Sequence, residues 1–207
     1  IYVKKENLQT TGAFKLRGAF NKVASLSEEQ RAKGVIAASA GNHAQGVAFA
    51  AKHFESQAVI VMPESTPITK INGVASYGAE VLLAGSNYDE AYAYATEYAQ
   101  KNSLVFIHPF EDDEVIAGQG TVALEMLSEH ADLDVLVVPM GGGGLISGVA
   151  VAAKAINPHI KVIGVSATGA PALKSSFDQK RVIDTSSVRT IADGIAVRDT
   201  SPVTLEY

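Results

Sequence analysis

The sequence predicts an α/β protein built on an open parallel sheet. Between residues 34 and 167, short apolar runs alternate with longer amphipathic segments, which is the pattern of repeated βα units. The apolar runs are rich in Val, Ile and Leu and do not alternate with polar residues, as expected for strands buried on both faces. Helix-length segments separate these runs, and parallel strands need such crossovers.

The expected elements follow one another along the chain. A helix is expected first, at Phe14–Leu26, because Thr11 is a suitable N-cap and because Leu16, Phe20 and Val23 have helical spacing. The expected strands are Val35–Ala38, Ala58–Met62, Val81–Ala84, Leu104–Ile107, Val135–Met140 and Val162–Val165. The further helices are expected at His43–Phe54, Thr69–Tyr77, Tyr88–Lys101, Gln119–His130, Leu145–Ile156 and Ala170–Phe177.

Length and composition exclude several classes of protein. The chain has 207 residues, which suits one larger domain or two small lobes, and its 47% hydrophobic and 19% charged residues are ordinary globular proportions. It has no cysteine, which excludes disulfides, thiolate metal sites and cysteine nucleophiles. The formal net charge of −5 argues against nucleic acids and acidic lipids as partners, so any anion site must be local.

Two features that resemble other kinds of site have plainer interpretations. The charge-free stretch from Val135 to Ala153 is 19 residues long, but Pro139 and four successive glycines interrupt it. A strand, a turn and a helix explain it better than a membrane span, and no membrane association is expected. No metal is expected either, because carboxylate clusters and ligand spacing are lacking around the five histidines, His43, His53, His108, His130 and His159.

The most informative segment is Val138–Leu145, in which an expected strand runs into four glycines and then a helix. Such a turn exposes backbone N–H groups at the positive end of the helix, and that combination binds phosphate. The spacing matches neither a dinucleotide fingerprint nor a Walker loop, so a monophosphate fits better than a nucleotide. The alternative is that close packing of helix on strand needs small residues here.

Two further segments carry chemistry. The turn Ser39–Gly46 follows a strand and presents Ser39, Asn42 and His43, so its N–H groups could hold a carboxylate, although an ordinary loop with a polar cap explains it equally well. Lys15 lies near the start of a helix, where the dipole opposes its positive charge and burial would lower its pKa further. A lysine with a lowered pKa can form a Schiff base, but taken alone Lys15 is better explained as a surface lysine.

Together these segments supply a phosphate cradle, a carboxylate-binding turn and an amine nucleophile, which an amino-acid enzyme using pyridoxal phosphate requires. Over essentially all 207 residues the chain resembles the serine/threonine dehydratases (threonine ammonia-lyases) of the tryptophan-synthase-β-like, fold-type II pyridoxal-phosphate enzymes. The motifs that carry the resemblance are Thr11-Gly-Ala-Phe-Lys-Leu-Arg-Gly18, Ser39-Ala-Gly-Asn-His-Ala-Gln-Gly46, Ala117-Gly-Gln-Gly-Thr121, Gly141-Gly-Gly-Gly-Leu145 and Thr190-Ile-Ala-Asp-Gly194.

The resemblance implies a role for each site residue. Lys15 would be the catalytic lysine and would form the Schiff base with pyridoxal 5'-phosphate. Phe14 would lie beside the cofactor ring, and Asn42 would bind the phenolic oxygen of that ring. The other cofactor-binding residues would be Gly141, Gly142, Gly143 and Gly144 with Leu145 around the phosphate, and Gly194 on the far side. The substrate carboxylate would be bound by Ser39, Ala40, Gly41, Asn42 and His43.

The resemblance also implies the reaction and the architecture. Lys15 would remove the Cα proton of L-threonine or L-serine, loss of the β-hydroxyl would follow, and hydrolysis would give a 2-oxo acid and ammonia. The fold would be a two-lobed, three-layer αβα structure, with residues 34–111 in a small lobe and residues 1–33 and 112–207 in a partial larger lobe. We expect a cytoplasmic homo-oligomer, a dimer or tetramer, whose partner is a small amino-acid substrate.

Three points leave alternatives open. Serine racemases of the family carry a second serine where this chain has Ala40, which disfavours racemisation. Their cation site uses an acid where this chain has Ser166, which again argues against a metal. Family segments are expected to be missing at both ends, so the alternatives are a serine racemase or other fold-type II relative, or a truncated, non-catalytic cofactor-binding fragment.

Overall fold

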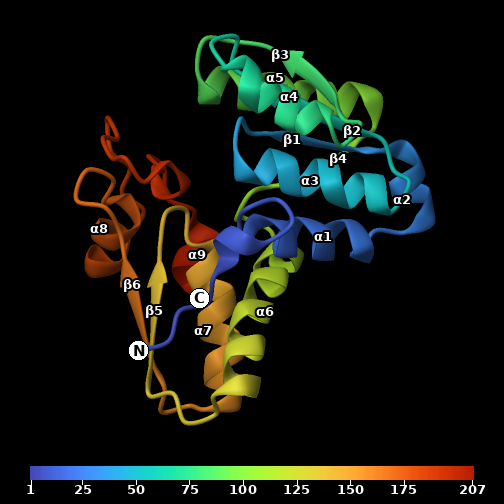
Figure 1. The fold of residues 1–207 in the computed structure, drawn as a ribbon. Coiled ribbons are helices and arrows are strands. Elements are labelled where there is room, and N and C mark those ends of the chain that lie inside the picture. Colours follow the sequence, from blue (N-terminus) through green and yellow to red (C-terminus); the bar gives the residue numbers. More distant parts are fainter. The chain divides into compact units, whose positions relative to one another are not determined.

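The computed structural model describes residues 1–207, which divide into two units according to their internal contacts. One unit is formed by residues 5–109, and the other, called the 110–207 unit, is formed by residues 110–207 together with residues 1–4. Each unit combines parallel strands with helices (Figure 1), so the α/β class predicted from the sequence is confirmed. No helix is both long enough and apolar enough to cross a membrane.

The 5–109 unit contains a four-stranded sheet in which every neighbouring pair of strands is parallel. The strand order is β3-β2-β1-β4, so β1 lies in the interior of the sheet. Every residue of β1 and β2 is buried, as predicted for strands covered on both faces, whereas the edge strand β3 is partly exposed. The strands are β1 (Val35–Ala38), β2 (Ala58–Met62), β3 (Glu80–Leu83) and β4 (Val105–Phe106).

Helices cover both faces of this sheet. One face packs Ile36, Ala38, Val59 and Val61 against the alanines of α5 (Tyr88–Asn102). Successive side chains of a strand point to opposite faces, so the intervening residues face α3 (Asn42–His53), which lies on the other side of the sheet (Figure 1). The remaining helices of the unit are η1 (Glu6–Leu8), α1 (Lys15–Ser25), α2 (Glu28–Lys33) and α4 (Ile68–Ala75).

Helix α1 packs on the side of α3 that faces away from the sheet (Figure 1). A Cβ atom added to Gly46 of α3 would lie 3.2 Å from both the Cα atom of Leu16 and the carbonyl oxygen of Lys15. Only glycine allows the two backbones to approach so closely without displacing a neighbour. This contact places the start of α1 beside the first turns of α3.

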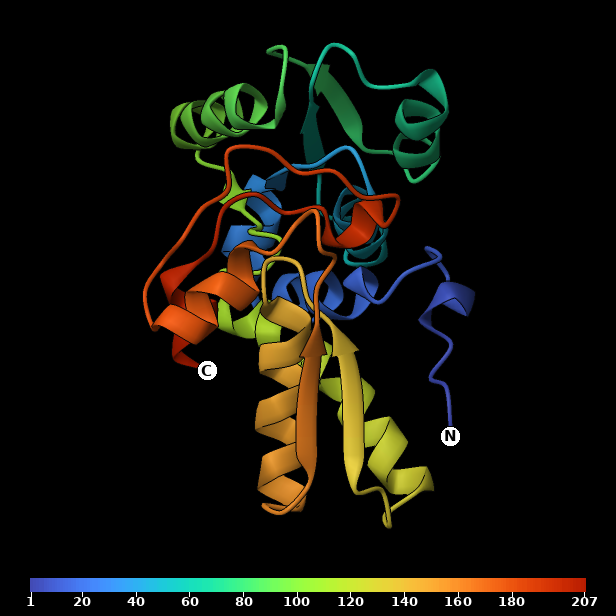
Figure 2. The same ribbon diagram turned by 90° about the vertical axis from the view of Figure 1, so that its left-hand side faces the viewer.

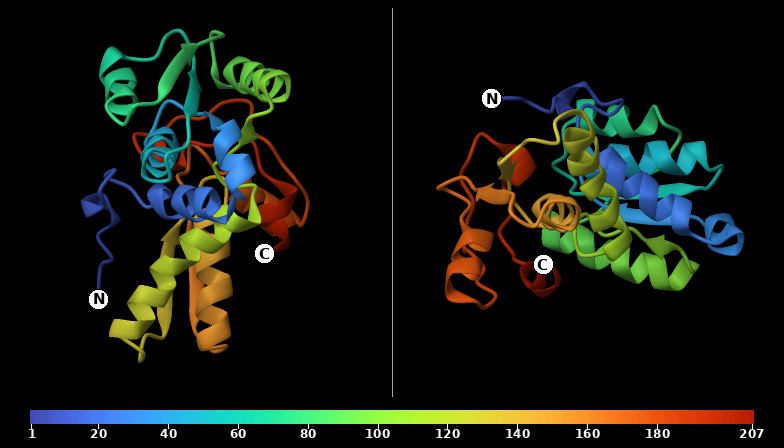
Figure 3. Two further views of the ribbon diagram at one scale, coloured as in Figure 1. Left: turned by 90° about the vertical axis from the view of Figure 1, so that its right-hand side faces the viewer. Right: turned by 90° about the horizontal axis from the view of Figure 1, so that it is seen from below.

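The 110–207 unit is built on a parallel pair of strands, β5 (Val135–Pro139) and β6 (Lys161–Val165), which lie side by side in Figure 2. Its core lies between this pair and two helices, α6 (Asp113–Glu129) and α7 (Gly144–Ile156), which run next to each other in Figure 3. Two shorter helices, α8 (Ala172–Gln179) and α9 (Pro202–Glu206), and the 3-10 turn η2 (Asp193–Ile195) complete it.

The sequence-based expectation of strands buried on both faces is wrong for β5 and β6. Leu136 and Val138 are buried in the core, whereas Val135 and Val137 are exposed on the opposite face. The reason is that α6 and α7 cover one face of this strand pair only. The apolar run of β5 therefore hides an alternation of buried and exposed positions.

Helix limits differ from the predicted ones where a capping residue was overlooked. Helix α6 begins at Asp113 rather than Gln119, because Asp112 accepts hydrogen bonds from the amides of Glu114 and Val115. Helix α2 was not predicted, although Ser27 and Gln30 form a reciprocal capping box at its start.

The division into units differs from the predicted lobes at residues 5–33, and also at residues 110 and 111. These residues, which include α1, belong to the same unit as residues 34–109, because α1 packs on α3. The predicted lobe boundaries stay a prediction.

The contact between α6 and α7 gives a first test. We expect Gly148→Ala to lower the free energy of unfolding by about 1–3 kcal/mol, because overpacking of this size costs that much. The new Cβ atom would lie 2.2 Å from the carbonyl oxygen of Ile116. Urea unfolding followed by circular dichroism measures the change.

The matched control is Gly73→Ala in α4, where no heavy atom lies within 4 Å of the new Cβ. Because alanine is the better helix former, this change should raise the free energy of unfolding by about 0.5–1 kcal/mol. Equal effects of the two substitutions would contradict the packing explanation.

Candidate functional site

Lys15 is the first residue of α1, and its Nζ atom donates a hydrogen bond of 2.7 Å to the carbonyl oxygen of Pro109. The side chain is half-buried, with Nζ 5.5 Å from the centre of the Phe14 ring. Burial lowers the pKa of the Lys15 amine from 10.5 to about 8. At pH 7 about one such amine in ten is unprotonated, against about one in three thousand for an ordinary lysine. Lys15 thus has the properties of a nucleophilic amine.

The segment before α1 differs from the expectation in one respect. The N-cap residue of α1 is Phe14, which makes no side-chain capping bond, so the predicted cap at Thr11 is wrong. The chain turns at Gly12, whose φ of 73° is in the left-handed region that favours glycine. Thr11 is buried before this turn, and its hydroxyl has no hydrogen-bond partner.

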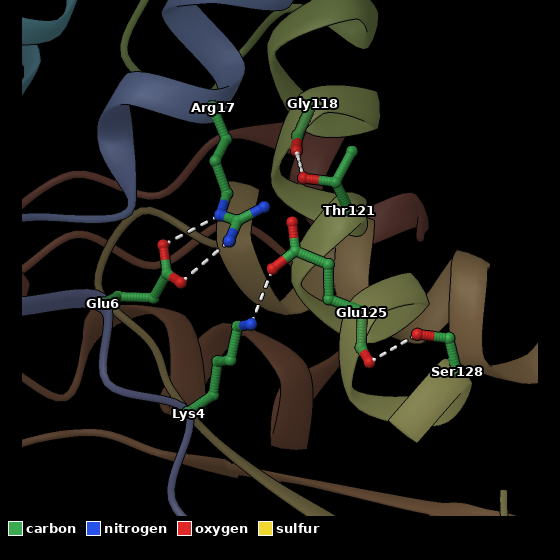
Figure 4. Close-up of polar contacts among 7 residues, drawn as sticks. All are labelled: Lys4, Glu6, Arg17, Gly118, Thr121, Glu125 and Ser128. Carbon is green, nitrogen blue, oxygen red and sulfur yellow. Dashed lines mark hydrogen bonds and ion pairs between the residues drawn. The ribbon is translucent and has the colours of Figure 1, made fainter. Parts of the chain in front are cut away.

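An ion pair fastens this segment to α1. The guanidinium of Arg17 donates to both carboxylate oxygens of Glu6, at 2.8 Å from Nε and 2.9 Å from a terminal nitrogen (Figure 4). This ion pair is largely shielded from solvent, with 10% of the Arg17 side chain exposed. Paired hydrogen bonds of this kind fix orientation as well as distance. Arg17 therefore holds η1 against the helix that begins at Lys15.

The turn from Ser39 to His43 lies between the end of β1 and the start of α3, as expected. Gly41 is the N-cap of α3 and provides no side-chain cap, and no acceptor is recorded for the amides of Asn42 and His43. Amides at a helix start that lack an acceptor attract anions. The Asn42 side chain is exposed, whereas Ser39 and Ala40 are half-buried. The turn can therefore present N–H donors and one amide side chain to a ligand.

His43 is turned away from solvent, with 3% of its surface exposed. Its Nε2 lies 2.8 Å from the carbonyl oxygen of Ile107, and because a carbonyl only accepts, Nε2 must carry the proton. Burial, followed by the positive charge of Lys15, lowers the pKa of His43 to about 3. The ring is thus neutral at physiological pH. A role in binding a carboxylate would fall to the backbone amide of His43, because the side chain is committed to Ile107.

The glycine segment joins β5 to α7 in the 110–207 unit, with Gly143 as the N-cap at φ 96°. No acceptor is recorded for the amides of Gly141, Gly142 and Gly143, nor for that of Gly144 at the first helical position. These N–H groups lie at the helix end that carries partial positive charge, which is the arrangement that binds phosphate. Leu145 packs its side chain against the core of the unit, so only its backbone is available to a ligand.

Close packing also explains why these positions are glycines. A Cβ atom at Gly142 would lie 2.5 Å from the Phe110 ring, and one at Gly143 would lie 2.6 Å from the hydroxyl of Thr204. Thr204 also donates a hydrogen bond of 2.8 Å to the carbonyl oxygen of Gly142. The loop is therefore held by its neighbours, and the packing alternative and the phosphate interpretation are compatible.

Gly194 lies in η2 and is exposed, with no atom within 4 Å of an added Cβ. The residues that follow it approach the glycine segment. A Cβ atom at Gly141 would lie 2.9 Å from a methyl group of Val197 and 3.0 Å from the Cα atom of Ile195. The structure thus brings the motif around Gly194 next to Gly141, within the same unit.

Several residues of these sites were not found from the sequence. Pro109 and Ile107, which accept from Lys15 and His43, are 94 and 64 positions away from them. Phe110 and Thr204, which enclose the glycine segment, are 32 and 62 positions away from Gly142. No local pattern marks these partners. Among them only Pro109 has a fixed φ and restricts the residue before it, which is a weak signal of a rigid segment.

The residues present fit pyridoxal phosphate. The 110–207 unit offers four successive amides without acceptors at a helix start, which suit a phosphate group. The 5–109 unit offers an amine of lowered pKa, which suits an aldehyde.

Comparison with known proteins agrees with this chemistry. Residues 1–207 match the family described as pyridoxal-phosphate dependent enzyme. The L-threonine ammonia-lyase of Thermotoga maritima is 53% identical over 206 residues, which cover 100% of this chain and 51% of that protein. The biosynthetic L-threonine dehydratase of Haemophilus influenzae is 50% identical over 198 residues, covering 96% and 39%. The chain spans about half the length of the curated relatives it matches.

Solved structures show the same similarity. Threonine deaminase isoform 2 from Solanum lycopersicum superposes with a TM-score of 0.96 at 45% identity, covering 99% of this chain and 56% of that one. Maize serine racemase gives a TM-score of 0.94 at 39% identity, covering 98% and 61%. The predicted fold class and cofactor are thereby confirmed. The chain belongs to the family of pyridoxal-phosphate-dependent enzymes.

Proposed function

We propose that this chain carries the lysine, the phosphate cradle and the carboxylate-binding turn of an ammonia-lyase that acts on L-threonine and L-serine. The observation that carries the proposal is Lys15, an amine whose pKa is lowered to about 8 at the start of α1. The similarity to proteins named L-threonine ammonia-lyase supports threonine as a substrate. The proposal that L-serine is also a substrate rests on the family resemblance.

The overall reaction is an elimination of water followed by hydrolysis. The substrate loses its Cα proton and its β-hydroxyl group, and the released enamine takes up water to give ammonia and 2-oxobutanoate from threonine, or pyruvate from serine. Bound pyridoxal phosphate would supply an aldehyde that bonds to amines and a ring that delocalises the electron pair left at Cα.

Lys15 would perform the proton transfer. An unprotonated amine can accept the Cα proton, and a pKa of about 8 keeps a useful fraction of Lys15 in that form near neutral pH. The carbonyl oxygen of Pro109 accepts from Nζ and so limits where the amine can point. Phe14, directly before Lys15 in the chain, would lie beside the ring of the cofactor.

The other site residues would bind the cofactor and hold the substrate in position. The amides of Gly141–Gly144 would hold the phosphate, and Gly194 would line the cofactor site. The turn from Ser39 to His43, with Ala40 and Gly41 between them, would hold the substrate carboxylate through backbone N–H groups. Asn42 would hydrogen-bond the phenolic oxygen of the cofactor ring through its exposed side chain.

A serine racemase is the second candidate, because maize serine racemase is 39% identical to this chain. Racemisation needs an acid or base on the face of the substrate opposite Lys15. By resemblance that group is a serine at the position of Ala40, whose methyl side chain can neither accept nor donate a proton. Elimination is therefore the better supported reaction. A cytoplasmic location and a dimeric or tetrameric assembly remain proposals that rest on the resemblance.

The first experiment measures products. Incubated with pyridoxal phosphate and L-threonine or L-serine, the protein should form 2-oxobutanoate or pyruvate together with ammonia, and no D-amino acid. Ala40→Ser restores a side chain that can exchange a proton, and should add measurable D-serine. Lactate dehydrogenase coupling measures the oxo acid, and chiral chromatography measures the D-amino acid. Absence of oxo acid from both substrates would refute the proposed reaction.

The second experiment tests Lys15. Addition of pyridoxal phosphate should produce the visible absorption band of an imine, at a rate that rises with pH up to about 8 and is constant above it, because only the unprotonated amine reacts. Lys15→Ala should abolish the band, whereas Lys52→Ala, which removes an exposed lysine of α3, should leave it unchanged. A band that persists in Lys15→Ala would show that Lys15 does not form the imine.

The third experiment tests the glycine segment. Gly143→Ala forces a side chain into a left-handed conformation and against Thr204, so affinity for pyridoxal phosphate should fall at least about tenfold, or about 1.4 kcal/mol. The matched control is Gly78→Ala, at φ 87° and with no atom within 4 Å of the new Cβ. Gly78→Ala introduces similar backbone strain at a position outside the glycine segment. Fluorescence titration with pyridoxal phosphate measures both, and equal losses would speak against the cradle.

A further inference from the structure

One series of contacts links Lys15 to the first turns of α3 and to the residues that follow β4. Gly46 of α3 packs on the backbone of Lys15 and Leu16. His43 lies one turn earlier on the same face of α3, because residues three apart are neighbours on a helix. Its Nε2–H group donates to the carbonyl oxygen of Ile107 at 2.8 Å. Two residues later, the carbonyl oxygen of Pro109 accepts from the Nζ atom of Lys15 at 2.7 Å.

The segment from Ile107 to Pro109 is stiff enough to connect these two bonds. The amide of Ile107 donates to the carbonyl oxygen of Ile36 in β1 at 2.8 Å, and the Ile107 side chain is fully buried. The ring of Pro109 fixes its φ and disfavours helical conformations for His108. A displacement of Ile107 would therefore move the carbonyl of Pro109.

We propose that His43 is the positioning residue of Lys15: by holding the carbonyl of Ile107, it keeps the carbonyl of Pro109 at the Nζ atom of Lys15. The inference rests on the proposed function only for the importance it gives to Lys15. His43 does not need to touch substrate or cofactor for this task.

The alternative is that His43 merely fills space in the core. Its other ring nitrogen, Nδ1, is buried without a hydrogen-bond partner, which is costly for a residue chosen only to fill space. A leucine would fill the same region without that cost. The retained polar ring is explained by its Nε2–H bond, since Ile107 would otherwise be left with a buried carbonyl that lacks this donor.

The test compares two substitutions at the same position. His43→Gln keeps an N–H donor at about the place of Nε2, whereas His43→Leu removes the donor and keeps an apolar volume. The matched control is His53→Gln, which makes the same change at an exposed position of the same helix. The readout is the pKa of Lys15, from the pH dependence of its 13Cε chemical shift in lysine-labelled protein, assigned with Lys15→Ala.

We expect the pKa of Lys15 to stay near 8 in the parent protein, in His43→Gln and in His53→Gln. In His43→Leu the segment carrying Pro109 should loosen and admit water, so the pKa should rise toward 10.5 by at least about one pH unit, because burial is what lowers it. An unchanged pKa in His43→Leu would overturn the proposal. So would an equal rise in His43→Gln and His43→Leu, because that would mean the hydrogen bond is irrelevant.

A measurement on the unaltered protein keeps the proposal testable if His43→Leu does not fold. The 15N shifts of the His43 ring should show Nε2 protonated and Nδ1 unprotonated throughout the range pH 5–9, since the pKa of this ring is about 3. Titration of His43 near its ordinary value of 6.5, or a proton on Nδ1 instead, would overturn the proposal. Neither readout needs cofactor or substrate. A failed threonine assay would therefore contradict the proposed function without deciding the role of His43.

Discussion

The close approach of α1 to α3 at Gly46 is the constraint on which the arrangement around Lys15 depends. The carbonyl of Lys15 would lie 3.2 Å from a side chain at this position, so the start of α1 can sit beside α3 only because none is there. The amine of Lys15 is buried in this arrangement, and burial lowers its pKa. The lowered pKa of Lys15 is thus a result of burial rather than of a neighbouring charge.

The glycine segment of the 110–207 unit is closely packed at every one of its four positions. Phe110 and Thr204 press against it, and a side chain at either Gly142 or Gly143 would overlap them. The amides of this loop have no backbone acceptor within the protein. Close packing alone accounts for glycine at all four positions, and the proposed binding of phosphate is compatible with it.

The sequence predicted those features that contiguous residues determine. The limits of β1 and β2 are as expected, and the turns after β1 and β5 occur where small residues follow an apolar run. It could not indicate which carbonyl receives Lys15, because Pro109 is far along the chain. It misjudged β5, since coverage of one face by α6 and α7 is a tertiary property. It did not identify Asp112 as a cap, because the acidic run of Asp112, Asp113 and Glu114 is equally typical of a solvated loop and of a helix start.

The bond between Lys15 and Pro109 has a consequence for how the chain acquires its chemistry. The two residues are 94 positions apart, and β4, which leads into Pro109, pairs with β1 and so closes a long segment of chain that contains β2, β3 and three helices. Closing such loops costs entropy and is slow compared with local helix formation. In an unfolded or partly synthesised chain Lys15 therefore has the basicity of any lysine. The lowered pKa of Lys15 depends on burial, so it is a property that the amine acquires only in the folded chain.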